Sequence, residues 1–438
     1  MKRLFLPLSL LLLCLPLTLA AQSAPWSLDD CIDYAMQHNP SLMHRGVEYS
    51  LREESLKEAS NSRVPVISAG AQETFHMGNT LIMYSIDENL TMSLTQIGAA
   101  LEMPLITGGR IPNTRTAEEY ALKSAAENIA VSKLNLRIRV SAAYLQLLCD
   151  KSRQEMAVEQ VALCKEQLRS VSKMVDEGVR TGADLSETKA ELSAAEHSLT
   201  AAEGAVGISK LALAGIMGLE DDSAFDIVAI EGAVTDDDSA PLLPMLENLD
   251  NHPAVLSAQY AISSAEYRAK AARGAYYPQL SLFANYNNYF YFPIGAPGIH
   301  VGSQLGGNGW GALGLKLAIP ILNTSTRAQA SKAKLAIEDA RVTLAETRME
   351  LSRQIREAYF QTITARERYS SALKTEAASK EAYQYRQKTF DAGLATVYEL
   401  NQSRLQWVSA CSQTLQSKYE YLLRKRILAY YNVYGEEN

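Results

Sequence analysis

The chain has 438 residues, which is long enough for two or three domains, and its 49 acidic residues outnumber the 42 basic ones to give a formal net charge of −7. This acidic balance argues against nucleic acid as a partner. The six histidines are scattered without a pair at metal-ligand spacing, and the sequence contains neither a nucleophile elbow nor a phosphate-binding loop. We therefore expect no enzyme activity, no cofactor and no metal site.

Residues 1–20 have the pattern of a secretory signal peptide. A basic start at Lys2 and Arg3 is followed by a largely apolar run over residues 4–19 and by the small residues Ala20 and Ala21. Beyond it no segment offers 18 consecutive apolar residues, so we expect no transmembrane helix in the exported chain. The chain is then either periplasmic or inserted in an outer membrane as strands.

The remaining sequence repeats itself at an offset of 213 to 216 residues. Pro65 recurs as Pro278, and "AYLQ" at residues 143–146 recurs as "AYFQ" at residues 358–361. This pattern predicts two structural repeats, over residues 22–218 and 241–435. Between them lies an acidic linker over residues 219–240, which carries eight acidic residues and no basic one. We expect the linker to be a solvated connector.

Each repeat contains two strands followed by two long helices. The first has strands over about residues 64–76 and 93–105 and helices over about 113–177 and 183–216. The second has strands over about 278–290 and 310–320 and helices over about 325–392 and 395–434. Residues 113–177 contain no glycine or proline, and helices of such length occur in coiled coils, membrane bundles and helical barrels. Abundant alanine and serine between the apolar positions favour a cylinder of helices, with a soluble coiled-coil rod as the alternative.

The predicted strands alternate apolar residues with small or polar ones. Two of them show this most clearly, through Ile97, Ala99, Leu101 and Met103 and through Leu313, Leu315, Leu317 and Ile319. A period of two places the apolar side chains on one face, which is typical of transmembrane barrel strands; an ordinary sandwich strand is the alternative. Phe283 departs from the alternation. Four strands cannot close a barrel, and lipid tolerates no open sheet edge, so the chain must pool its strands with other copies.

Several of these features together resemble the TolC family of outer-membrane efflux channels. They are the repeat, its starts at Asn39-Pro40 and at His252-Pro253, the strand-flanking prolines and the glycine turns after the long helices. The resemblance covers essentially the whole chain after the signal peptide. It implies a mainly α fold with a transmembrane β part, in which a homotrimer pools its strands in a twelve-stranded barrel continued by a long periplasmic α-helical barrel.

The resemblance also implies a function and partners. The protein would lie in the outer membrane, in contact with its lipid, and extend into the periplasm. It would act as a passive export duct coupled through a periplasmic adaptor protein to an inner-membrane pump. A structural or adhesive coiled-coil envelope protein without channel activity is the alternative. The sequence does not define the cargo.

The two glycine turns are the candidate adaptor-docking tip. "GVRT" contributes Gly178, Val179 and Thr181, and "GLAT" contributes Gly393, Leu394 and Thr396. A left-handed residue is least costly where a helix ends, so each glycine is also explained as a plain C-cap.

Residues just after the turns are the candidate periplasmic gate. Asp184 and Glu187 follow the first turn, and Glu399 and Gln402 follow the second. The family carries acidic rings near the closed tip, at the positions of Glu399 and Gln402, and Gln402 departs from the acid often found there. If Glu399 faces the lumen, three copies concentrate negative charge at the constriction. A solvated helix face is the alternative.

Overall fold

A computed structural model describes residues 25–77, 80–82, 85–87, 92–220, 225–229, 242–293 and 301–436. The predicted signal peptide over residues 1–20 lies outside these residues. The chain forms two compact units: unit 1 comprises residues 1–40, 135–239 and 360–428, and unit 2 comprises residues 41–134, 240–359 and 429–438. Each unit is described by itself.

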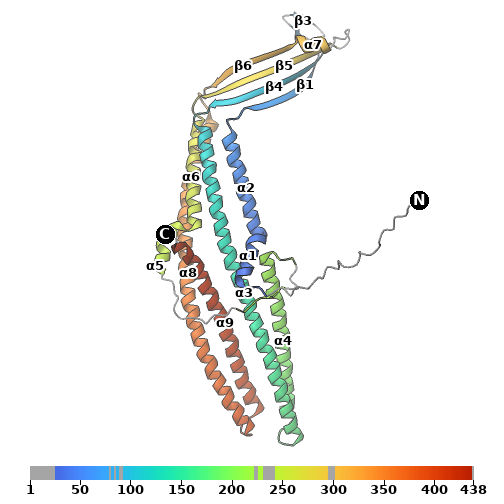
Figure 1. Ribbon diagram of the computed structural model, residues 1–438, viewed down its shortest axis with the longest axis vertical. Helices are drawn as coiled ribbons and strands as arrows, with labels where there is room; N and C mark the ends of the chain where they lie inside the picture. The colour runs from blue at the N-terminus through green and yellow to red at the C-terminus, as the bar shows by residue number, and fades with distance from the viewer. Residues whose placement is uncertain are drawn as a thin grey trace, which may run out of the picture. The chain divides into compact units, whose positions relative to one another are not determined.

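Unit 1 is helical. It contains α1 (Leu28–His38), residues 135–176 of α3 (Arg110–Asp176) and α4 (Gly182–Met217). It also contains residues 360–391 of α8 (Thr324–Asp391) and residues 397–428 of α9 (Val397–Glu436). Two hairpins, α3–α4 and α8–α9, make up most of the unit (Figure 1).

Unit 2 combines helices with the sheet. Its helices are α2 (Pro40–Asn61), α5 (Leu242–Glu247), the short 3-10 helix η1 (Leu249–Asn251), α6 (Pro253–Gly274) and α7 (Val301–Gly307). Residues 110–134 of α3, 324–359 of α8 and 429–436 of α9 complete its helical part. Its strands are β1 (Val66–His76), β2 (Thr80–Ile82), β3 (Ser85–Asp87), β4 (Met92–Ile106), β5 (Gln279–Pro293) and β6 (Gly309–Ala318).

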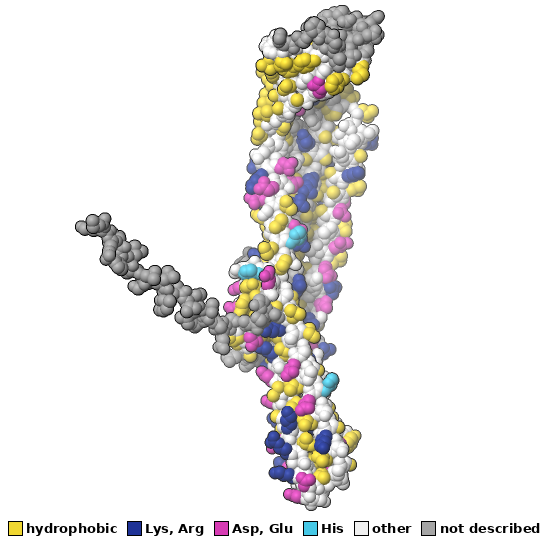
Figure 2. Space-filling model, turned by 90° about the vertical axis from the view of Figure 1, so that its right-hand side faces the viewer, with side chains coloured by type: hydrophobic (Ala, Val, Ile, Leu, Met, Phe, Trp, Pro, Cys, Tyr) yellow, Lys and Arg dark blue, Asp and Glu magenta, His cyan; other side chains and the backbone are white. Residues whose placement is uncertain are grey.

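The four long strands form one antiparallel sheet in the order β1-β4-β5-β6 (Figure 1). The pairing register aligns Ile67, Leu101, Ala284 and Leu313 in one row across the sheet. Because side chains alternate between faces, this row and its neighbours at steps of two make one face apolar. Leu313, Leu315 and Leu317 are 60–76% exposed there. Figure 2 shows hydrophobic side chains gathered over the strands.

The opposite face of the sheet is small and polar. A shallow hollow on it is lined mainly by Ser68, Gly70, Gln72, Gln96, Gly98 and Asn287. The register also explains why Phe283 departs from the alternation. Phe283 lies on this polar face opposite Gly314, and its ring occupies the space that a Cβ at Gly314 would need, 2.9 Å away. The aromatic ring therefore covers a cross-strand glycine.

Two further strands and one helix form between the predicted strands, where we predicted neither a strand nor a helix. The helix is α7, and its anchor is Gln304, which is 5% exposed. Its amide oxygen accepts a hydrogen bond from the Tyr291 backbone N–H at 2.7 Å, and its amide nitrogen donates to the Tyr291 carbonyl at 3.1 Å. Gln304 thus binds the β5 backbone as a neighbouring strand would, which local sequence patterns do not reveal.

Within residues 225–229 of the acidic linker, Phe225 and Ile227 are buried while Asp226, Val228 and Ala229 are exposed, so our expectation of a solvated connector fails for the two buried residues. Phe225 and Ile227 are 4% and 5% exposed, and Ile227 forms a parallel bridge with Trp26. The Tyr144 hydroxyl donates to the Val228 carbonyl at 2.6 Å, and burial raises the pKa of Tyr144 to about 12. Apolar residues alternate with other residues inside this acidic run. The apolar side chains can therefore face the core while the acidic side chains next to them face water.

Helix α4 is long and apolar enough to cross a membrane by length and composition, which we did not expect from the sequence. Its apolar second half combines alanine with leucine, isoleucine and valine, and it also contains Glu203 and Lys210. A single helix that meets this criterion does not by itself indicate a membrane span.

Candidate functional site

The turns α3–α4 and α8–α9 have the same backbone. Gly178 and Gly393 are left-handed, with φ of +76° and +75°. In the first turn, the N–H of Gly178 donates to the Val175 carbonyl at 3.0 Å, and the N–H of Val179 donates to the Met174 carbonyl, five residues back, at 2.8 Å. In the second turn, the corresponding bonds measure 2.9 Å each. This pair of bonds is the Schellman motif, which satisfies the last carbonyls of a helix and favours glycine at the left-handed position.

The helices that leave both turns begin with the same cap. The Thr181 N–H donates to the Asp184 carboxylate at 3.0 Å, and the Asp184 N–H donates to the threonine hydroxyl at 3.3 Å. Thr396 and Glu399 form the same reciprocal pair at 3.0 and 3.2 Å. These are capping boxes, and the spacing T-x-x-D/E would have revealed them in the sequence. Two of the four candidate gate residues therefore also cap helices.

The caps keep both carboxylates ionised. The backbone N–H of Thr181 is the largest cause that lowers the pKa of Asp184, and that of Thr396 does the same for Glu399. Arg386, 3.7 Å from Glu399, adds to the second effect. At neutral pH each turn is thus followed by a fixed negative charge.

The other candidate residues differ in their surroundings. Val179 is 67% exposed and Leu394 is 82% exposed, so each turn presents an apolar side chain to solvent. Glu187 is half-buried, and Gln402 is exposed. Among the described residues, no hydrogen bond or ion pair joins the gate candidates on α4 to those on α9.

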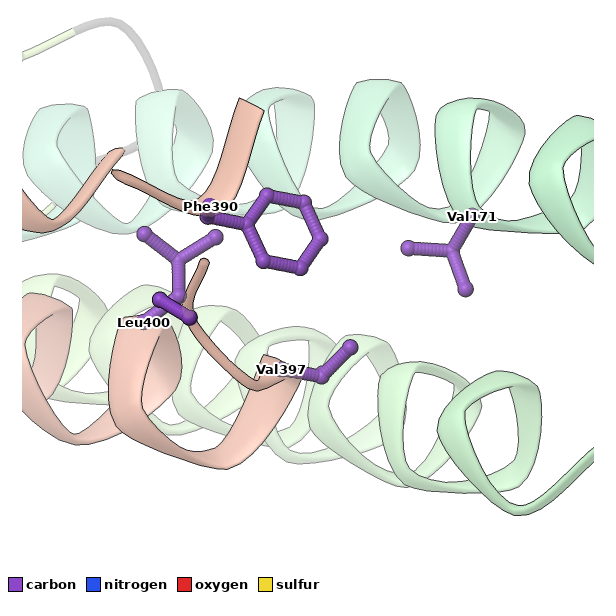
Figure 3. Close-up of a cluster of buried hydrophobic side chains, with 5 residues drawn as sticks. Val171, Phe390, Val397 and Leu400 are labelled. Atoms are coloured by element: carbon purple, nitrogen blue, oxygen red, sulfur yellow. The ribbon is translucent and has the colours of Figure 1, made fainter. Parts of the chain in front are cut away.

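A small hydrophobic core lies beneath the tips. Figure 3 shows Val171 of α3 and Phe390 of α8 pointing toward one another, with Val397 and Leu400 of α9 beside them. Together with Ala395, these residues are at most 5% exposed. Because the core draws on both hairpins, it packs the end of α3 against the α8–α9 turn.

Arg180, which we did not single out from the sequence, joins the two turns. Its guanidinium carbon lies 4.6 Å from the centre of the Phe390 ring, and Nη2 donates to the Ala395 carbonyl at 3.1 Å. A comparison of the repeats at this position, where Arg180 matches Ala395, is the sequence signal that could have drawn attention to it.

Arg404 is a second residue that sequence reasoning missed. It is 1% exposed, and it joins α9 to α3 and α4. Nη1 donates to the Gln167 side-chain oxygen at 2.7 Å, Nη2 donates to the Asn401 side-chain oxygen at 3.2 Å, and Glu191 is its ion-pair partner. Burial lowers the pKa of Arg404 from its ordinary value, yet arginine titrates so far above neutral pH that the charge remains. A pattern of apolar positions cannot signal a buried charge.

Within the described residues, no three His, Cys, Asp or Glu side chains gather closely enough to hold a metal ion.

Comparisons with known proteins place the fold and the family. Residues 31–219 and 246–429 match the family model described as outer membrane efflux protein. The chain is 24% identical over 271 residues to the outer membrane efflux protein BepC of Brucella suis, a match that spans 62% of this chain but only 57% of BepC.

Solved structures of similar fold include a membrane protein from Pseudomonas aeruginosa, with a TM-score of 0.78, 18% identity, and coverage of 92% of this chain and 93% of that one. The CmeC outer membrane channel of Campylobacter jejuni gives a TM-score of 0.78 at 17% identity, with 94% and 87% coverage. The outer membrane protein VceC of Vibrio cholerae gives 0.75 at 15% identity, with 92% and 95% coverage. The match to the family model, which extends over most of its length, shows that this chain belongs to the outer membrane efflux protein family.

Proposed function

We propose that this protein is the outer-membrane channel of a tripartite export system. It is a passive duct without catalytic activity, made of two structural repeats and exported with a cleaved signal peptide. A periplasmic adaptor protein couples it to an inner-membrane pump, which supplies the energy. Family membership and the channel CmeC among the similar folds support this proposal.

The observation that carries the proposal is the four-stranded sheet with one exposed apolar face. Its row of Ile67, Leu101, Ala284 and Leu313 is suited to lipid, and its opposite face is suited to a water-filled interior. Among the described strands, β1 and β6 each have a neighbour on one side only. Lipid offers no hydrogen-bonding partner for such edges, so strands of other copies must cover them. We propose a homotrimer with twelve pooled strands.

The turns at Gly178 and Gly393 are the proposed adaptor-docking tip. Their exposed apolar residues, Val179 and Leu394, lie at the ends of long hairpins. Exposed apolar side chains mark an interaction site when they belong to a larger apolar patch. Thr181 and Thr396 set the direction of the returning helices through their capping boxes.

Asp184, Glu187, Glu399 and Gln402 are the proposed periplasmic gate. The capping boxes support this role in one respect, because they hold Asp184 and Glu399 ionised and in place at the start of each returning helix. In a trimer these charges would recur three times around the axis and favour cations at the constriction.

Detergent extraction tests the assembly. We expect an outer-membrane protein that elutes as a stable trimer and conducts ions in planar bilayers. A monodisperse monomer with intact strand content would contradict the pooled barrel. A soluble periplasmic rod without conductance would instead support a structural envelope protein.

Charge substitution at the tip tests docking. Leu394→Asp places a charge on an 82% exposed side chain, so the fold and the trimer should persist while export falls. Leu405→Asp, at a 58% exposed leucine further along α9, is the matched control. Trimer abundance in outer-membrane fractions and ethidium accumulation are measured in the same cells. Normal export by the Leu394 variant with a normal trimer would refute docking at this turn.

A further inference from the structure

The two turns carry few contacts of their own. A Cβ added at Gly178 or at Gly393 would meet no atom within 4 Å, so the backbone of each turn stands clear of its surroundings. Val179 and Leu394 project from these turns into solvent. Apart from Ala395, which packs in the core below the tips, these turn residues make few contacts, and segments with few contacts open locally at low free-energy cost.

Arg180 adds a polar contact to this packing, because its side chain leaves its own turn and binds the other one. The Phe390 ring beneath its guanidinium is 4% exposed and fixed in the core below the tips. The Ala395 carbonyl, which accepts its hydrogen bond, belongs to the α8–α9 turn itself. A planar guanidinium can stack on a ring and donate in its own plane at the same time, so one side chain makes both contacts.

The second turn shows that Arg180 is not needed to close a turn. The two repeats correspond at an offset of 215 residues, so Ala395 corresponds to Arg180 and Val175 corresponds to Phe390. The second turn therefore has no arginine–phenylalanine pair. Its left-handed glycine and its backbone hydrogen bonds are nevertheless the same as those of the first turn. The side chain of Arg180 therefore contributes something other than local turn geometry.

We infer that Arg180 is a positioning residue, which ties the two turns of one chain into a single composite surface and holds Val179 and Leu394 at a fixed spacing. The inference rests on the proposed docking role of the turns. It adds that the partner contacts both turns at once, with an apolar side chain for each. Two linked contacts of this kind reinforce one another only while their spacing is fixed.

Hydrogen exchange in the purified full-length protein tests the tie. Arg180→Ala should accelerate amide exchange across residues 392–396, on the other turn, by about two- to tenfold. Phe390→Leu, which keeps apolar volume but removes the ring, should accelerate exchange across residues 177–181 in return. Arg169→Ala, at an exposed arginine of α3, the helix that leads into the first turn, is the matched control and should change neither segment. Unchanged exchange at residues 392–396 in the Arg180 variant would overturn the inference.

Export separates the inference from the proposed function. With a normal trimer, Arg180→Ala should raise ethidium accumulation in cells whose ethidium export depends on this protein, and Arg169→Ala should not. If Arg180→Ala loosens the second turn but leaves export normal while Leu394→Asp abolishes it, the inference is wrong and docking stands. If Leu394→Asp leaves export normal, docking at the tip fails whatever Arg180 does.

Discussion

Replacing Arg404 by methionine should destabilise the helices of unit 1 more than any surface change. The guanidinium is 1% exposed, and its ion-pair partner Glu191 has a side chain that is 13% exposed. Methionine fills much of the same volume but leaves the Glu191 carboxylate without its counter-charge in a place with little water. Removing one member of a buried pair costs about 3–5 kcal/mol.

The double variant should recover most of this loss. Replacing Arg404 and Glu191 together by methionine removes both charges, and apolar residues in place of a buried pair are often neutral. We expect the double variant to be more stable than Arg404→Met alone by at least about 2 kcal/mol, because the two positions are in direct contact. Gln167 and Asn401 keep a partner in each other, since their side chains are hydrogen-bonded at 3.1 Å.

Native-state hydrogen exchange measures this local stability without requiring the whole protein to unfold reversibly. Peptides that cover Gln167, Glu191 and Arg404 should exchange roughly 100- to 4,000-fold faster in Arg404→Met, since each 1.4 kcal/mol corresponds to a factor of ten. Arg169→Met, at an exposed position of α3, should leave them unchanged. Exchange within tenfold of the parent protein, or a double variant as labile as the single one, would refute the reasoning.

Three further outcomes follow from the site and its supports. Glu399→Ala removes both the cap and the charge, whereas Glu399→Gln keeps the cap and removes only the charge. If the charge lines the gate, both variants should lower the cation preference in planar bilayers. An effect of Glu399→Ala alone would assign the residue to capping. Burial lowers the pKa of His252 to about 4, so protonation of the unfolded chain should remove about 3 kcal/mol of stability as the pH falls from 6.5 to 4. His252→Asn, which can still cap α6, should flatten this loss in thermal unfolding, and an unchanged pH dependence would contradict the assignment. Gly393→Ala should cost only about 1–2 kcal/mol, because its left-handed φ is the sole penalty. Gly108→Ala should cost more in the same unfolding measurement, since its Cβ would clash with the Gly274 carbonyl oxygen, and equal losses would show that the clash is relieved.

Much of the fold could be predicted from local pattern. The absence of glycine and proline over residues 113–177 predicts a long helix, and α3 spans Arg110–Asp176. Alternation in residues 310–320 predicts a strand with an apolar face, and β6 spans Gly309–Ala318 with its leucines exposed. The glycines at 178 and 393 mark the turns because only glycine adopts a left-handed conformation without strain. These features depend on residues that are neighbours in the chain, so the chain alone carries the signal.

The tertiary structure decided which distant residues meet. The Arg180–Phe390 and Arg404–Glu191 pairs join residues 210 and 213 positions apart, and the packing of Phe225 and Ile227 depends on Trp26 and Tyr144. No periodicity encodes such a contact, because the free energy of a charge depends on the partner and the burial that folding supplies. The sequence by itself determined the lengths of the helices, the faces of the strands and the places of the turns. Only the folded chain determined that Arg404 is buried with a partner and that one arginine joins the two turns.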